Sequence, residues 1–202
     1  MSDPAAVARV VRDALARPRD LALAASLPAP MELAIALGDA PALEWALPEL
    51  IGALAPLGIA RTHLEVVLGC DASGAARRAT CVRLRAALAP TRVHAHDARH
   101  DETFVAARLD GIELRLDDAL RESEGLVLVI AARPGSRGDE LAGETIASLA
   151  DQPSRVAHAG RLRAVASALP IDLALVIETG DPPRAWVGTG RWLLAERFPP
   201  AS

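Results

Sequence analysis

Short apolar runs alternate with longer stretches of helical periodicity along most of this chain. The runs are rich in Val, Leu and Ile and are bounded by turn residues, which is typical of buried strands. Four of them predict strands: MELAIAL (31–37), HLEVVLG (63–69), GLVLVIAA (125–132) and IDLALVIE (171–178). The patterns between and around them predict helices over residues 5–16, 42–55, 75–88, 140–149, 160–168 and 190–197. This alternation predicts an α/β fold with a mostly parallel sheet and flanking helices.

Three further features refine this picture. GLVLVIAA is the most apolar run, so we expect it at the centre of the sheet. The shorter runs FVAAR and GIELRL flank Asp110-Gly111, and this turn chemistry predicts a strand pair. The segment RPGSRGD (133–139) is the clearest loop in the chain. We therefore expect two lobes, an N-terminal lobe over residues 1–135 and a shortened C-terminal lobe over residues 136–202.

Composition and charge narrow the possible functions. The 202 residues carry a net charge of −4, so no global positive field attracts nucleic acid or acidic membranes. No apolar run approaches the roughly 18 residues that a membrane span requires, and the N-terminus does not resemble a secretory leader. We expect a cytoplasmic protein without nucleic-acid or membrane partners. All 22 basic residues are arginine, which rules out Schiff-base chemistry and a lysine general base.

Several segments follow one another in an order that resembles a known family. They are the strand and helix over residues 34–58, HLEVVLGCD, RVHAHDARHD, the helix start AGETI and IDLALVIETGDPPRAWVGTG. In this order they resemble the nickel-dependent lactate racemases and their relatives. The resemblance implies a two-lobed α/β protein that binds a nickel-pincer nucleotide between its lobes. It also implies racemisation or epimerisation of 2-hydroxy acids by hydride transfer to and from that cofactor.

The departures from this family concern the residues that carry its chemistry. The nucleotide-holding turn Asp-x-Thr-Arg-Pro reads Asp39-Ala40-Pro41-Ala42-Leu43 here, and the Gly-Thr-His turn with its catalytic histidine reads Gly69-Cys70-Asp71. Arg133-Pro134 stands where the second catalytic histidine is expected, and the loop with the cofactor-anchoring lysine is deleted. Ala150 takes the place of the nickel-coordinating histidine. We therefore expect the nickel-pincer nucleotide to be lost, with no other cofactor in its place.

Three residues remain candidates for a rebuilt site. Asp71 follows a predicted parallel strand, where α/β folds place ligands, and could act as a general base if it is buried. The alternative is that Asp71 caps the following helix. His96 is the second catalytic candidate, with a structural role in capping its loop as the alternative. Asp39 is the cofactor-binding candidate, and its alternative is a turn or cap.

The only clustered histidines in the sequence, His94, His96 and His100, are the candidates for a metal site. Residues two apart on a strand point to the same side, so His94 and His96 could share a ligand. The sequence supplies no obvious third and fourth ligand, and the spacing of Cys70 and Cys81 is not that of a zinc site. We therefore predict no metal site.

A degenerate relative of the lactate racemases is the function that this pattern favours. We expect a protein without racemase activity that binds a small anionic ligand or a partner protein in the former cofactor cleft. The alternative is a racemase, an epimerase or another hydroxy-acid enzyme rebuilt around Asp71 and His96. A third class is a regulatory or structural interaction module, which predicts an exposed apolar patch or a dimer contact. The oligomeric state does not follow from the sequence.

Overall fold

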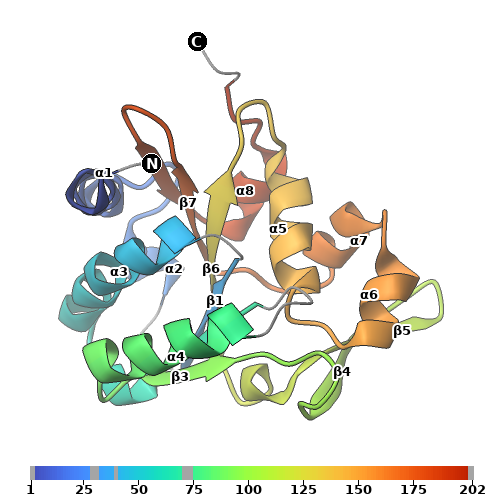
Figure 1. Ribbon diagram of the computed structural model, residues 1–202. Coiled ribbons are helices and arrows are strands. Elements are labelled where there is room, and N and C mark those ends of the chain that lie inside the picture. The colour runs from blue at the N-terminus through green and yellow to red at the C-terminus, as the bar shows by residue number, and fades with distance from the viewer. Residues whose placement is uncertain (1–2, 28–31, 39–40, 70–74, 200–202) are drawn as a thin grey trace.

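One six-stranded sheet with the strand order β3-β2-β1-β6-β7-β8 forms the centre of the protein (Figure 1). The computed structural model describes residues 3–27, 32–38, 41–69 and 75–199. The strands are β1 Leu33–Leu37, β2 Leu64–Leu68, β3 Arg92–Ala95, β6 Gly125–Ala132, β7 Leu173–Glu178 and β8 Arg184–Gly188. Neighbouring strands run parallel except β7 and β8, which are antiparallel. The predicted α/β fold with a mostly parallel sheet is confirmed, and GLVLVIAA forms a central strand, β6.

Helices cover both faces of the sheet (Figure 1). The first half of the chain supplies α1 Pro4–Ala16, α2 Leu23–Ser26, α3 Leu47–Leu54 and α4 Ala75–Leu88. The second half supplies α5 Gly138–Ala147, α6 Gln152–His158, α7 Leu162–Ser167 and α8 Gly190–Ala195. Short 3-10 helices are η1 Pro41–Ala46, η2 Ala55–Leu57, η3 Arg61–His63 and η4 Asp118–Leu120. The chain therefore places its early helices on one face and its late helices on the other.

Two hydrophobic clusters follow from this arrangement, one on each face of the sheet. Helices α1, α3 and α4 pack on the first, and α5, α7 and α8 pack on the second. On β1 the large side chains Leu33, Ile35 and Leu37 face the first cluster, whereas Ala36 faces the second, because side chains alternate along a strand. The small residue on the second face leaves room for α5 to lie close to the sheet.

The predicted strand pair around Asp110-Gly111 is confirmed. It forms a separate two-stranded antiparallel sheet, β4 Thr103–Leu109 and β5 Ile112–Asp117. Asp110 (φ 51°) and Gly111 (φ 82°) both have left-handed backbone conformations, as hairpin turns of the type I′ class require. Leu114 and Leu116 of β5 are buried in the second cluster, so the hairpin is packed onto the body of the protein.

The predicted helix over residues 42–55 begins later than its apolar pattern suggests. Residues Pro41–Ala46 form the 3-10 helix η1, and the α-helix α3 starts at Leu47 with Pro48 in its first turn. Proline lacks an amide hydrogen and clashes with the preceding turn, so it is tolerated only at the start of an α-helix. The pattern also missed α6, which begins at Gln152. Its N-cap is Asp151, whose carboxylate accepts a hydrogen bond of 2.8 Å from the Ser154 amide.

The predicted boundary between the lobes falls between β6 and α5. Strands from both sides of residue 135 belong to the same sheet, and β6 and β7 join the two ranges through backbone hydrogen bonds. Separately, none of the helices in the described ranges is long and apolar enough to cross a membrane.

Candidate functional site

A cavity opens where the direction of chain winding reverses. Strands β1, β2 and β3 follow one another outward in one direction from β1, whereas β6, β7 and β8 extend the sheet in the other. The carboxyl ends of β1 and β6 lie at this reversal, where α/β folds bind their ligands. A cavity of about 250 Å³ is found there. Among the described residues it is lined by Gly38, Ile130, Ala131, Arg133, Leu141, Glu144, Thr145 and Ser148.

Helix α5 forms one wall of this cavity and lies close to the strand ends. A Cβ atom placed on Gly69 would come within 1.9 Å of Ser148 Oγ, and one on Gly38 within 3.3 Å of Thr145 Oγ1. Glycine at these positions therefore lets the last turns of α5 contact the ends of β1 and β2. The Thr145 hydroxyl donates to the Leu141 carbonyl (3.0 Å) and the Ser148 hydroxyl to the Thr145 carbonyl (2.6 Å). Both hydroxyl oxygens keep lone pairs that can accept a hydrogen bond from a ligand.

Among the described lining residues, the charged side chains are Arg133 and Glu144, which form an ion pair. Arg133 follows β6, and its Nη2 donates to both carboxylate oxygens of Glu144 at 2.8 Å and 2.6 Å. The two side chains are 69% and 46% exposed. An exposed pair of this kind contributes little to stability, and a competing anion can replace the glutamate.

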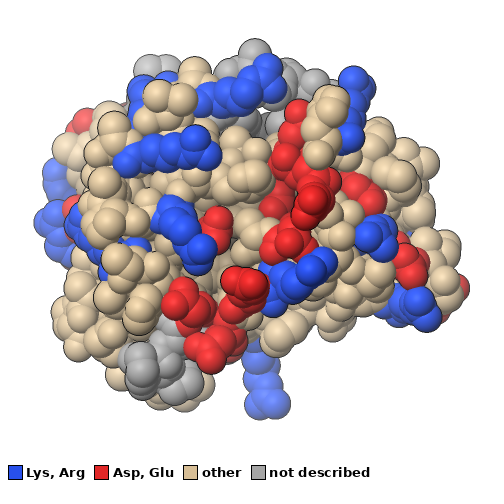
Figure 2. Space-filling model, turned by 90° about the horizontal axis from the view of Figure 1, so that it is seen from below, with Lys and Arg blue, Asp and Glu red and all other residues tan. Residues whose placement is uncertain are grey.

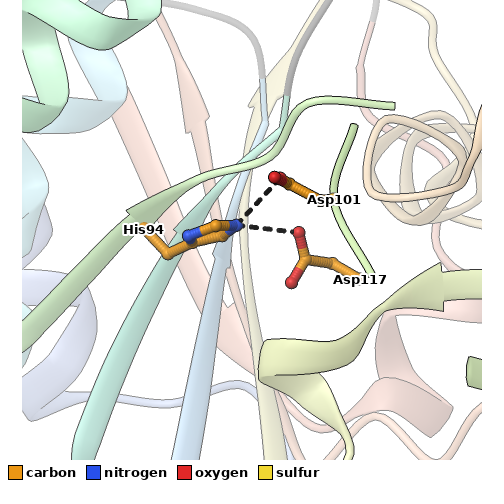
Figure 3. A group of neighbouring side chains, drawn as sticks. All are labelled: His94, Asp101 and Asp117. Carbon is orange, nitrogen blue, oxygen red and sulfur yellow. Dashed lines mark hydrogen bonds and ion pairs between the residues drawn. The ribbon is translucent and has the colours of Figure 1, made fainter. Parts of the chain in front are cut away.

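A second group of polar side chains joins β3, which carries His94, to Asp101 and to Asp117 at the end of β5 (Figure 3). His94 Nε2 is 2.9 Å from Asp117 Oδ2 and 3.1 Å from Asp101 Oδ2. His96 Nδ1 is 2.6 Å from the same Asp117 oxygen, and His96 Nε2 is 3.0 Å from the Ala150 carbonyl. Asp117 and His96 are almost completely buried, whereas the His94 and Asp101 side chains are 31% and 25% exposed. Four polar residues from three segments of the chain thus form one hydrogen-bonded cluster.

Hydrogen bonding shifts the protonation of this cluster. The hydrogen bond to Asp117 raises the pKa of His94 to about 8; burial opposes this shift, and the charges of Asp117 and Asp101 add to it. Burial alone would raise the pKa of Asp117, but the hydrogen bonds from His94 and His96 outweigh it and hold this pKa well below its usual range. At neutral pH His94 is therefore an imidazolium and Asp117 a carboxylate.

The contribution of His94 to the stability of the protein should therefore fall as the pH rises. The pKa of His94 is higher in the folded state than its ordinary value of 6.5, so its protonation favours folding. This contribution, about 1–2 kcal/mol, is complete below pH 6.5 and is lost as the pH rises through about 8. Urea unfolding of the parent and of His94→Gln, with chelator present, measures it between pH 6 and pH 9. The stability difference between the two proteins should shrink over this window, and a constant difference would contradict the assignment.

The candidate site residues from the sequence are only partly placed by the structure. Asp39, Cys70 and Asp71 lie outside the described residues. His96 is described, and it does not line the cavity; both of its ring nitrogens face acceptors, Asp117 Oδ2 and the Ala150 carbonyl. These contacts tie His96 to the end of β5 and to the Ala150 carbonyl rather than to its own loop.

Sequence reasoning missed Asp101 and Asp117, the partners of the two histidines. Asp117 ends β5 and also accepts a hydrogen bond of 2.9 Å from the Ala119 amide, so in sequence it is indistinguishable from an ordinary cap of η4. Asp101 is four residues beyond Asp97, whose amide donates to Asp101 Oδ2 at 2.5 Å. The available signal was the density of histidine and aspartate in HAHDARHD, but only the hairpin brings Asp117 to it.

The described residues around the cavity do not fit the nickel cofactor that the family resemblance implies. None of the described lining residues is a histidine or a cysteine, and the chain contains no lysine. Ala150, at the place that the resemblance assigns to the nickel-coordinating histidine, is fully buried in the second hydrophobic cluster. Its carbonyl accepts from Arg155 at 2.8 Å and lies 3.0 Å from His96 Nε2, and its amide donates to the Ala147 carbonyl at 3.2 Å. The described lining residues and Ala150 therefore offer no imidazole or thiolate ligand for nickel.

The surface at the amino ends of the strands is mostly acidic. A hollow of about 630 Å³ lies there, and its charged lining residues are Glu32, Glu65, Arg92, Asp118 and Glu122. Arg92 is 3.3 Å from Glu65 and 3.9 Å from Glu32. Figure 2, which views the molecule from below, likewise shows acidic side chains gathered beside arginines. An anionic ligand is thus repelled from this hollow, and the Arg133 cavity suits it better.

Comparison with known proteins supports the fold. No protein-family model matches the chain, and no curated protein matches it. Among solved structures, it is similar to the lactate racemase apoprotein from Thermoanaerobacterium thermosaccharolyticum, with a TM-score of 0.66 at 14% identity. The match covers 91% of this chain and 52% of that chain, so this chain spans about half the length of that protein. At this identity the likeness shows a lactate-racemase-like fold and nothing about activity.

Proposed function

We propose that this chain is a lactate-racemase-like protein that binds a small carboxylate at the junction of β1 and β6 and does not racemise it. The observation that carries the proposal is the cavity at this junction, with Arg133 at its wall. Its position matches the place where open α/β sheets bind ligands. Its volume of about 250 Å³ lies below the usual range for drug-sized ligands, which favours a small molecule over a dinucleotide.

The lining supports a carboxylate that also carries a hydroxyl group. Arg133 has five N–H donors in a planar fork suited to carboxylates. The hydroxyl oxygens of Thr145 and Ser148 can accept a hydrogen bond from the ligand hydroxyl. Ile130 and Leu141 supply apolar contacts for a short carbon chain. A 2-hydroxy acid such as lactate combines these features.

The proposed loss of racemisation is supported by the residues found at the positions that the family's chemistry requires. The family's route needs a metal ligand, a cofactor anchor and two histidines, and these positions hold other residues or are deleted. Losing the group that accepts the hydride removes the reaction itself rather than slowing it. Binding can survive such a loss, because Arg133 and the hydroxyls do not depend on the cofactor.

Titration of the full chain with lactate by calorimetry or by NMR tests the binding proposal. Arg133→Gln should weaken lactate binding at least tenfold, because the charged hydrogen bonds to the carboxylate are lost. Glu144→Gln should strengthen binding severalfold, because it releases Arg133 from its ion pair. Arg108→Gln is the matched control: Arg108 pairs with Glu113 at 2.9 Å and is 70% exposed, but it lies outside the cavity.

Three results would overturn the proposal: no lactate binding by the parent, equal weakening by the two arginine variants, or racemisation of one lactate enantiomer. The last is measured by chiral chromatography after incubation of L-lactate with protein made in cells that assemble the nickel cofactor. Conversion of L-lactate to D-lactate in this experiment would instead favour the alternative, an enzyme rebuilt around Asp71 and His96. A ligand bound without turnover is the expected result.

A further inference from the structure

We propose that His94, Asp101 and Asp117 form a binding site for a divalent transition-metal ion, such as Zn²⁺. One ligand atom from each residue, His94 Nε2 and a carboxylate oxygen of each aspartate, lies within 4.8 Å of the others (Figure 3). The site is separate from the Arg133 cavity, since none of the three residues lines it. The inference therefore stands independently of the proposed function.

The spacing of the three atoms suits a metal ion. Zinc binds nitrogen and oxygen ligands at about 2.0–2.2 Å, which in a tetrahedral site places neighbouring ligand atoms about 3.3–3.6 Å apart. His94 Nε2 lies 2.9 Å from the Asp117 oxygen and 3.1 Å from the Asp101 oxygen. Small side-chain adjustments are thus enough to place an ion between them.

The charges also suit a dication. A single ring nitrogen faces two carboxylate oxygens, and one proton on that nitrogen must be shared between them. A divalent ion contacts all three atoms at once and balances both negative charges. One imidazole and two carboxylates are a ligand set that transition metals accept, whereas Mg²⁺ and Ca²⁺ prefer oxygen ligands alone.

Each carboxylate is held in place by groups outside the ligand set. His96 Nδ1 lies 2.6 Å from Asp117 Oδ2, and the Ala119 amide donates to Asp117 Oδ1 at 2.9 Å. The Asp97 amide donates to Asp101 Oδ2 at 2.5 Å. Such second contacts orient ligands before the metal arrives and raise its affinity.

The exposure of the three ligands shows how an ion reaches the site, and their number sets how many coordination positions stay open. The Asp117 side chain is 3% exposed, whereas His94 and Asp101 are about one quarter to one third exposed, so an ion enters from their side. Three protein ligands leave at least one coordination position for water, as in open zinc sites. Because the ligands come from β3, the following loop and the end of β5, a bound ion would tie the β4–β5 hairpin to the sheet.

Calorimetric titration of the full chain with Zn²⁺, after tag removal and EDTA treatment, tests this site. We expect one ion per chain and a rise in melting temperature that grows with Zn²⁺ concentration. His94→Gln and Asp101→Asn should each weaken binding about 10–100-fold. Both side chains are partly exposed, and circular dichroism checks that the variants are folded. If one variant fails to fold, the other still decides.

Controls separate this site from other histidines. His63→Gln and His100→Gln should keep full affinity, although His63 lies 4.0 Å from Glu32 and His100 lies 3.1 Å from Asp97. Co²⁺ supplies a spectroscopic readout, since its visible absorption should change when the imidazole of His94 is removed. No Zn²⁺ binding, binding lost through His63 or His100 instead, or Mg²⁺ binding as tight as Zn²⁺ would each overturn the proposal.

Discussion

Replacing Asp117 with alanine should lower the free energy of unfolding by about 3–5 kcal/mol, the range for removing one partner of a buried ion pair. The Asp117 side chain is 3% exposed and contacts both His94 and His96. Its removal leaves His96 buried opposite an empty position, and His94 loses its closest partner. The Ala119 amide also loses its acceptor, since Asp117 caps η4. Urea unfolding with chelator present, at pH 6.5, measures the loss.

Asp13→Ala is the control for this experiment. Asp13 is exposed on α1, so its replacement should change the unfolding free energy by no more than about 0.5 kcal/mol. A loss of less than 1 kcal/mol for Asp117→Ala would show that the cluster does not stabilise the fold. Failure of the Asp117 variant to fold, while Asp13→Ala folds normally, is the extreme form of the expected result.

Gly143→Ala should destabilise the protein by about 1–3 kcal/mol, the cost of overpacking a closely packed contact. Gly143 lies inside α5, and a Cβ atom there would come within 2.1 Å of the Leu162 carbonyl oxygen at the start of α7. The obstacle is backbone, so the two helices must move apart. This cost should exceed the gain of about 1 kcal/mol that alanine brings to a helix interior.

Gly52→Ala is the matched control, with the opposite sign. Gly52 also lies inside a helix, α3, but it is exposed and nothing lies within 4 Å of an added Cβ. Its replacement should stabilise the protein by about 0.5–1 kcal/mol. If thermal and urea unfolding gave the two variants shifts of the same sign, the close α5–α7 contact would be wrong.

The fold was predictable where a local pattern decides it. β6 has the bounds expected from GLVLVIAA, and α4 those expected for residues 75–88. Burial on both faces of a sheet demands continuous apolar runs, and Asp110-Gly111 carries its turn conformation in two residues. Predictions failed where two local signals compete, as at Pro48, which sets the start of α3 inside an apolar helical pattern.

The candidate site was predictable only in part. The period of a strand predicts that His94 and His96 point to the same side, and a ring nitrogen of each lies within hydrogen-bond distance of Asp117 Oδ2. No sequence pattern singled out Asp117, which is 23 residues from His94 and 21 residues from His96. The prediction that no metal site exists rested on the lack of further ligands in sequence. Asp101 and Asp117 supply such ligands in space, so this prediction now competes with a specific proposal.

Residue types and their local spacing were enough to predict the alternation of strands and helices and the central position of β6, and the composition alone shows that the chain has no lysine. These properties depend on residue type and local spacing. Two contacts became visible only once the chain was folded: the hairpin brings Asp117 to β3, and α5 closes a cavity beside Arg133. Such contacts join residues far apart in the chain. They depend on how whole elements pack, and no periodicity within one element records that packing.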